Sequence, residues 1–255
     1  MANQLTIIGL KGVPMVQPGD DLTAITLAAY AESGLAPENG DVLVVAQKIV
    51  SKAEGRIVAV PAVEPSPEAV ALAAEVGKDP RLVEVILSQS RRIVRHRQNL
   101  VITEHRRGWV MANAGIDHSN VGPDDGIERV LLLPVDPDAS AETLRQGLMD
   151  TTGKRIAVIV SDSFGRPFRC GTVGIALGAA GLPALIDWRG HPDLFGRKLE
   201  VTETGFADEI AAAASLVQGQ ADEATPIVLV RGLSWSAPDK PAAALIRLPE
   251  HDLFR

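Results

Sequence analysis

The chain has 255 residues, 46% of them hydrophobic and 22% charged, which is typical of a globular protein with a substantial core. Its formal net charge of −7 argues against a dedicated nucleic-acid binder. The single cysteine, Cys170, excludes a disulfide framework and indicates a reducing compartment. No signal-peptide pattern and no run of 18 apolar residues occurs, so we expect a cytoplasmic protein without membrane spans.

Apolar runs and capping residues predict strands and helices in the first half of the chain. Asp20 or Asp21 is expected to cap a helix that runs to Ala31. Ser66-Pro67 and Asp79-Pro80 each join an N-cap residue to a proline at the first helical position, so a helix follows each pair. The predicted strands are residues 5–10, 42–46, 100–103, 109–112 and 131–135.

The helix that follows Asp79 is predicted to carry one apolar stripe that extends as far as Ile93 and Val94. The same part of the chain is rich in arginine. This cluster is either a solvated helix face followed by a basic turn, or a surface that attracts an anionic ligand. Its members are Arg91, Arg92, Arg95, Arg97, Arg106 and Arg107.

Capping residues and apolar runs also predict the helices and strands of the second half of the chain. Asp136 is expected to cap a helix that ends near Met149, and a helix over 208–218 is expected to end at Gly219. Strands are predicted at 156–160, 199–202 and 227–230, with a glycine-rich stretch at 171–181. Strands and helices do not alternate strictly, so we predict an α+β fold of mixed sheets with packed helices. Residues 1–255 show no clean internal boundary and are expected to form one domain of one or two interleaved lobes.

Two aspartate-containing segments, 113–120 and 161–167, each follow a strand-like apolar run. They place Asp117 and Asp162 beside glycine and small polar residues, including Asn120 and Ser163, in what we expect to be turns. Carboxylates at strand ends are suited to a hard cation that carries phosphates. Each segment alone is more typical of an ordinary Asp-rich turn, and it is their occurrence together that favours a cation site.

Lysines follow the strand predicted at 42–46 in a segment that we expect to be turn-like. Lys52, with Lys48 and Arg56 near it, is suited to hold nucleotide phosphates, although such lysines taken alone are more often plain surface charges. The polar stretch 218–225 is suited to close over a ligand or to form a plain surface loop. Neither a Walker A motif nor a Gly-x-Gly-x-x-Gly fingerprint occurs, so a bound nucleotide would need a less common scaffold.

Read in order, these segments resemble the coenzyme F420:L-glutamate ligase family. The resemblance spans nearly the whole chain and depends most on Ile49-Val-Ser-Lys-Ala-Glu-Gly-Arg56 and Asn113-Ala-Gly-Ile-Asp117. The other matching segments are 12–15, 18–22, 40–45, 119–120, 133–138, 162, 165–166, 207–211 and 230–233.

The resemblance implies an amide ligase that uses GTP and a divalent metal to add L-glutamate, and further γ-linked glutamates, to the terminal carboxylate of coenzyme F420-0. It implies an acyl phosphate intermediate, release of GDP and phosphate, a family-specific fold and an intertwined homodimer. The implied metals are Mg²⁺ or Mn²⁺ at two sites, with K⁺ as an optional further cation. Bacterial relatives often carry a C-terminal flavin-dependent reductase domain, and residues 1–255 correspond to the ligase part alone.

The resemblance also assigns residues. Asp117 and Asp162 would bind one metal, Ser163 with Gln220 would hold a second, and Lys52 would act in catalysis with the aspartates. The implied GTP-binding residues are Val13, Pro14, Met15, Val16, Gln47, Lys48, Lys52, Asn120, Gln218, Gly219, Gln220, Ala221, Asp222, Glu223, Ala224 and Thr225.

Three residues depart from the family pattern. Ser163 stands where threonine is usual and keeps the hydroxyl, whereas Gln220 replaces a glutamate and removes one charge from the second metal site. His118 replaces a small residue. Three alternatives remain open: ligation of another carboxylic acid or amino acid, metal-dependent hydrolysis of a nucleotide phosphate, and nucleotide binding without catalysis.

Overall fold

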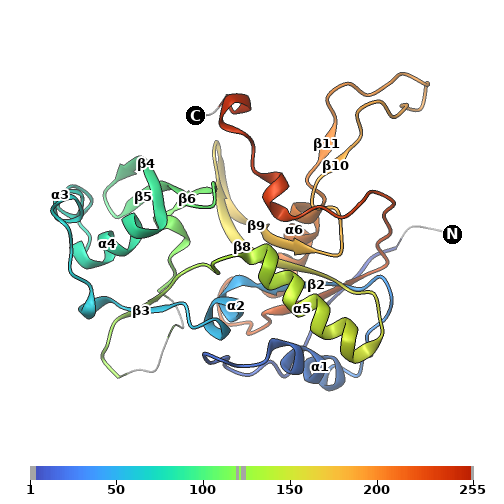
Figure 1. The fold of residues 1–255 in the computed structure, drawn as a ribbon, viewed down its shortest axis with the longest axis horizontal. Coiled ribbons are helices and arrows are strands. Elements are labelled where there is room, and N and C mark those ends of the chain that lie inside the picture. The colour runs from blue at the N-terminus through green and yellow to red at the C-terminus, as the bar shows by residue number, and fades with distance from the viewer. Residues whose placement is uncertain (1–3, 119–120, 122–124, 254–255) are drawn as a thin grey trace.

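The computed structural model describes residues 4–118, 121 and 125–253, and it is centred on a five-stranded sheet (Figure 1). The sheet has the order β1-β12-β2-β8-β9, in which β2 and β8 run parallel and the other neighbours are antiparallel. β2 is buried along most of its length, as a central strand covered on both faces requires. The strands are β1 (Thr6–Gly9), β2 (Val42–Ala46), β8 (Ala157–Arg166), β9 (Arg169–Ala180) and β12 (Ile227–Arg231).

Helices cover both faces of this sheet. One face packs on α1 (Leu22–Glu32), α2 (Gln47–Ala53) and α5 (Pro137–Thr152), and the other packs on α6 (Phe206–Gln218). Along β8 the two faces alternate, because side chains of a strand point in opposite directions in turn. Val158 and Val160 contact the first layer, whereas Ala157 and Ile159 contact the α6 layer.

The glycine-rich stretch explains how the helices come so close to β9. A Cβ atom at Gly178 would collide with the Pro137 carbonyl of α5, and one at Gly174 would collide with the Ala211 carbonyl of α6. Glycine at these two positions therefore lets backbone approach backbone on opposite faces of one strand.

A second region, left in Figure 1, joins a small sheet to two helices. The antiparallel strands β4 (Ser90–Arg97), β5 (Leu100–His105) and β6 (Val110–Ala112) lie beside α3 (Pro67–Val76) and α4 (Pro80–Gln89). A two-stranded ladder of β3 (Ile57–Ala59) and β7 (Arg129–Leu131) leads from this region to the central sheet. With separate sheets and helices packed on them, the fold is α+β, as predicted.

An arm projects from the body at the upper right of Figure 1. Its base is the short pair β10 (Ile186–Asp187) and β11 (Glu203–Thr204). Its apolar residues are uncovered: the exposed fractions of Leu194, Phe195 and Val201 are 100%, 89% and 84%.

The predicted helix caps are confirmed. The carboxylates of Asp21, Asp79 and Asp136 and the Ser66 hydroxyl each accept a backbone N–H of the helix that follows, and α6 ends at Gly219. Among the described residues, no helix has the length and apolar character that a membrane span requires.

Several predicted boundaries are wrong. α4 ends at Gln89, and Ile93, Val94 and most of the arginine cluster lie in or beside the β4–β5 hairpin, because cross-strand pairing replaces the helical pattern. The segment after β2, predicted as turn-like, forms the helix α2. The strand predicted at 131–135 lies at Arg129–Leu131, and that predicted at 199–202 lies at Glu203–Thr204.

The Val230-Arg-Gly-Leu233 segment has a structural role. Arg231 forms a bidentate pair with the fully buried Asp41, with Nε–Oδ1 2.7 Å and Nη2–Oδ2 2.9 Å. The Tyr30 hydroxyl donates to the same carboxylate at 3.0 Å. This network ties β12, α1 and the start of β2 together.

Candidate active site

The site lies where β8 extends beyond the end of its parallel neighbour β2. β2 ends at Ala46, opposite Ser161 of β8, and the chain turns directly into α2, whereas β8 continues to Arg166. The edge of β8 beyond Ser161 is therefore not paired by β2. Ligands of α/β sheets often bind outside the carboxyl ends of parallel strands, and we call this edge, where β8 extends past β2 beside α2, the β2–β8 crevice.

Asp162 faces the α2 side of this crevice and lies inside β8, not in the predicted turn, because β9 pairs with β8 beyond this point. Burial raises the pKa of the Asp162 carboxyl to about 7, and the negative charge of Asp117 raises it further against the opposing effects of the Ser163 backbone and Lys48. The two predicted metal ligands, 45 residues apart in sequence, are thus close enough to interact electrostatically.

Asp117 reaches the crevice from the β3–β7 ladder. Its backbone pairs with Leu131 through hydrogen bonds of 3.0 and 2.8 Å, so it extends this ladder by one bridge and is not in a turn. Its Oδ2 lies 2.8 Å from Lys48 Nζ, and each side chain is 27% exposed. The pair places one fixed cation beside two carboxylates.

Lys52 lies one helical turn after Lys48 on α2 and is only 6% exposed. Its pKa is lowered by burial and by the nearby Lys48, while Asp117 acts in the opposite direction. No carboxylate of the described residues lies within ion-pair distance of its ammonium group. A buried ammonium group in a crevice is suited to an anionic ligand, which would offset its desolvation.

The donor set fits a divalent cation. The carboxylates of Asp117 and Asp162 interact electrostatically, and Lys48 acts on both. The raised pKa of Asp162 comes mainly from burial and secondly from Asp117, and a bound cation would offset both effects. The described residues contain no group of three His, Cys, Asp or Glu side chains placed to hold a metal. Two protein carboxylates suffice for Mg²⁺ when water and phosphate oxygens complete its shell.

Ser163 and Gln220, the residues expected to hold a second metal, lie together on the other face of β8. The Gln220 amide donates to Ser163 Oγ at 2.8 Å. Two residues earlier, Ser161 Oγ donates to Gln218 Oε1 at 3.5 Å. Sequence reasoning missed Ser161, although its spacing from Ser163 places both hydroxyls on one face of a strand.

The predicted GTP-binding segments border the same crevice. Gln47, the first residue of α2, is 3% exposed and accepts the Ser51 hydroxyl at 2.9 Å. The polar stretch 218–225 leads from α6 back to β12, where Ala46 N donates to the Pro226 carbonyl at 2.8 Å. Thr225 packs against Gly9 at the end of β1.

The loop 13–16 runs from β1 toward α2. Val16 is buried in the core cluster that contains Ile49 and Val50, whereas Met15 is 68% exposed. Asn120 lies outside the described residues. His118 is half-exposed, with Nδ1 3.6 Å from the Glu128 carboxylate.

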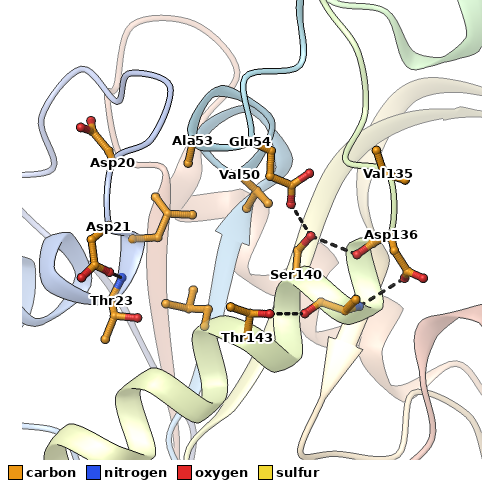
Figure 2. A pocket seen from close by; sticks show the side chains of 13 residues that line it. Asp20, Asp21, Thr23, Val50, Ala53, Glu54, Val135, Asp136, Ser140 and Thr143 are labelled. Atoms are coloured by element: carbon orange, nitrogen blue, oxygen red, sulfur yellow. Dashed lines mark hydrogen bonds between the residues drawn. The ribbon is translucent and has the colours of Figure 1, made fainter.

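A separate groove of about 530 Å³ lies on the opposite side of α2, between α1 and α5 (Figure 2). Val50 and Ala53 line it, whereas Lys48 and Lys52 do not. Its four carboxylates would repel a triphosphate. They belong to Asp20, Asp21, Glu54 and Asp136.

Comparison with known proteins identifies the family of this chain. The family model described as F420-0:Gamma-glutamyl ligase matches residues 11–232. The coenzyme F420:L-glutamate ligase of Methanothermobacter thermautotrophicus is 48% identical over 253 residues, covering 98% of this chain and 99% of its own. That of Methanopyrus kandleri is 48% identical over 98% and 99%, and that of Methanocaldococcus jannaschii 42% identical over 99% and 97%.

The matched region contains the β2–β8 crevice, Asp117, Asp162 and both lysines of α2. The chain belongs to the F420-0:gamma-glutamyl ligase family.

Proposed function

We propose that the protein is a GTP-dependent ligase that adds L-glutamate, and further γ-linked glutamates, to the terminal carboxylate of coenzyme F420-0. The proposal rests on the names of relatives that match along nearly the whole chain. The single structural observation that carries it is the convergence of Asp117 and Asp162 with the buried Lys52 at the crevice.

The need for a nucleotide follows from the substrate. A carboxylate is a poor acyl electrophile, because its charge repels an amine and oxide is a very poor leaving group. Transfer of the γ-phosphoryl group of GTP to the acceptor carboxylate gives an acyl phosphate and GDP. Attack by the glutamate amine then forms the amide, and phosphate leaves with the electrons of the broken C–O bond.

This chain's residues position and neutralise the reactants. Lys52, with Lys48 on the same face of α2, donates charge-assisted hydrogen bonds to phosphate oxygens. Asp117 and Asp162 would hold one Mg²⁺ or Mn²⁺, and Ser163 with Gln220 a second, so that bound cations offset charge on the transferring phosphoryl group. The stretch 218–225 and the loop 13–16 would enclose the rest of GTP.

We also propose a homodimer. An arm whose apolar residues are almost fully exposed is a contact surface rather than a solvated element, in agreement with this proposal. Sedimentation equilibrium should give twice the chain mass, and a monomer at micromolar concentration would contradict it.

One assay tests the ligase proposal. Purified protein is incubated with F420-0, L-glutamate, GTP and Mg²⁺ or Mn²⁺, and products are identified by mass spectrometry. We expect glutamylated coenzyme with equal amounts of GDP and phosphate, formed only when both the acceptor and glutamate are present. Phosphate release that does not require glutamate would instead indicate a phosphohydrolase, and ligation only to a different acid would overturn the acceptor.

A further inference from the structure

His105, at the end of β5, is a buried side chain with an unused donor. The residue is 5% exposed, and its ring packs on Trp109 with ring centroids 5.1 Å apart. Nδ1 accepts the backbone N–H of Arg107 at 3.0 Å, so the neutral ring carries its proton on Nε2. No group of the described residues accepts that proton.

The charges of arginines from separate segments act on this ring. Burial is the main cause that lowers the pKa of His105 to about 4, and the charges of Arg107, Arg106, Arg56 and Arg91 lower it further. The imidazole is therefore neutral near pH 7 and acts there as a hydrogen-bond donor without a charge of its own.

Two of these arginines pair with acidic residues, whereas the other two form no ion pair within the described part of the chain. Arg107 pairs with Asp136, and Arg91 lies 3.6 Å from Glu104. Arg56 donates Nε to the Leu133 carbonyl at 3.1 Å, and neither it nor Arg106 forms an ion pair with a described residue. Uncompensated positive charge is thus concentrated at one place in a chain whose net charge is −7.

The cluster lies within reach of the crevice. Leu132 N donates to the Arg56 carbonyl at 2.9 Å, and Ile57 and Asp117 both pair with Leu131, on opposite sides of β7. Neighbouring strands lie about 4.8 Å apart, so the backbones of Ile57 and Asp117 are separated by roughly 10 Å. The long side chains of Arg56 and Arg106 can extend across much of this separation, so the cluster can contact an acceptor group that lies next to the crevice.

We propose that His105 Nε2, Arg56 and Arg106 form an anion subsite that binds the phosphodiester of the acceptor acid, while the acceptor's carboxylate lies at the β2–β8 crevice. This proposal rests on the proposed function. A phosphodiester offers two charged oxygens to the planar N–H forks of arginine and a third acceptor to an imidazole N–H. The lysines of α2 remain for the nucleotide.

Direct binding provides the main test, without GTP, metal or glutamate. The intrinsic fluorescence of the deazaflavin F420-0 is titrated with the protein and with Arg106→Ala, an exposed position whose loss should leave the fold intact. We expect Kd to rise at least about tenfold. The matched control is Arg97→Ala, an exposed arginine of β4 that is not among those acting on His105, and its Kd should stay within about twofold.

Two further titrations identify which ligand supplies the anion that binds this subsite. A fluorescent GTP analogue should bind Arg106→Ala as it binds the parent protein, and equal weakening of both ligands would overturn the acceptor assignment. The His105 ring resonances should move when F420-0 or dimethyl phosphate is added. Movement with inorganic phosphate alone would mean an adventitious ion only, and would also overturn the proposal.

Failure of the two proposals can be told apart. If F420-0 binding depends on Arg106 but no glutamate is ligated, the subsite stands and the ligase proposal fails. If ligation proceeds and Arg106→Ala binds F420-0 with unchanged Kd, the subsite fails and the ligase proposal stands.

Discussion

The two faces of β8 differ in chemistry although their residues alternate along one strand. On the α2 face, Asp162 interacts electrostatically with Asp117 and Lys48, and Lys52 interacts with the same two residues. On the α6 face, Ser161 and Ser163 meet the neutral amides of Gln218 and Gln220. Charge that must be offset is therefore confined to one face, and we expect that face to supply the larger part of catalysis.

The largest expected effect comes from removing a carboxylate. Asp117→Asn or Asp162→Asn should lower kcat at least about 10³-fold, because the cation that offsets phosphoryl charge loses an ionic ligand. Asp150→Asn, which removes an exposed carboxylate of α5 outside the site, is the matched control for steady-state ligation assays. Near-normal turnover in either aspartate variant would remove the metal assignment.

Without metal, the same aspartate should reduce stability at high pH. The folded-state pKa of Asp162 is raised from 3.8 to about 7, so its favourable contribution is complete below pH 3.8 and is lost as the pH rises through 7. At roughly 1.4 kcal/mol per pKa unit, and with about half removed for partial solvent access, the loss is about 2 kcal/mol.

Urea unfolding in the presence of a chelator measures this loss. Asp162→Asn should be more stable than the parent protein at pH 8 and nearly equal to it at pH 4. The stability of Ser163→Ala should differ from that of the parent protein by the same amount at pH 4 and at pH 8. A variant that is less stable than the parent at pH 8 would contradict the desolvated-carboxylate interpretation.

Removal of the buried ammonium group of Lys52 should weaken nucleotide binding. Lys52→Ala is expected to raise the KM for GTP about tenfold, because a charge-assisted contact to phosphate is lost. The exposed Lys154→Ala controls for loss of positive charge alone. If both variants leave KM unchanged, Lys52 does not belong to the phosphate site.

The smallest effect on catalysis is expected from residues on the α6 face of β8. Gln220→Ala removes the hydrogen bond to Ser163 and should lower kcat/KM about threefold, whereas Gln220→Glu should tighten binding of the second cation by adding a charge. Titration of activity against Mn²⁺ distinguishes the two. A loss from Gln220→Ala as large as that from Asp162→Asn would remove the distinction between the faces.

Local sequence signals were sufficient to predict the helix starts, the central buried strand and the fold class. Side-chain caps such as Asp21 and Asp136 act within three residues, so the helix starts were predictable from sequence. The apolar run of β2 identified a buried strand, and the spaced motifs indicated the family. The confirmed α+β class follows from the order of these elements.

Tertiary packing decided the remainder. Whether Ile93 ends a helix stripe or joins a hairpin depends on pairing with β5, and whether Asp162 lies in a turn or a strand depends on β9. The Lys48–Asp117 pair and the arginines around His105 join segments far apart in sequence. Such contacts depend on how layers pack around the shared core, because proximity in space between distant segments leaves no periodic pattern in the chain.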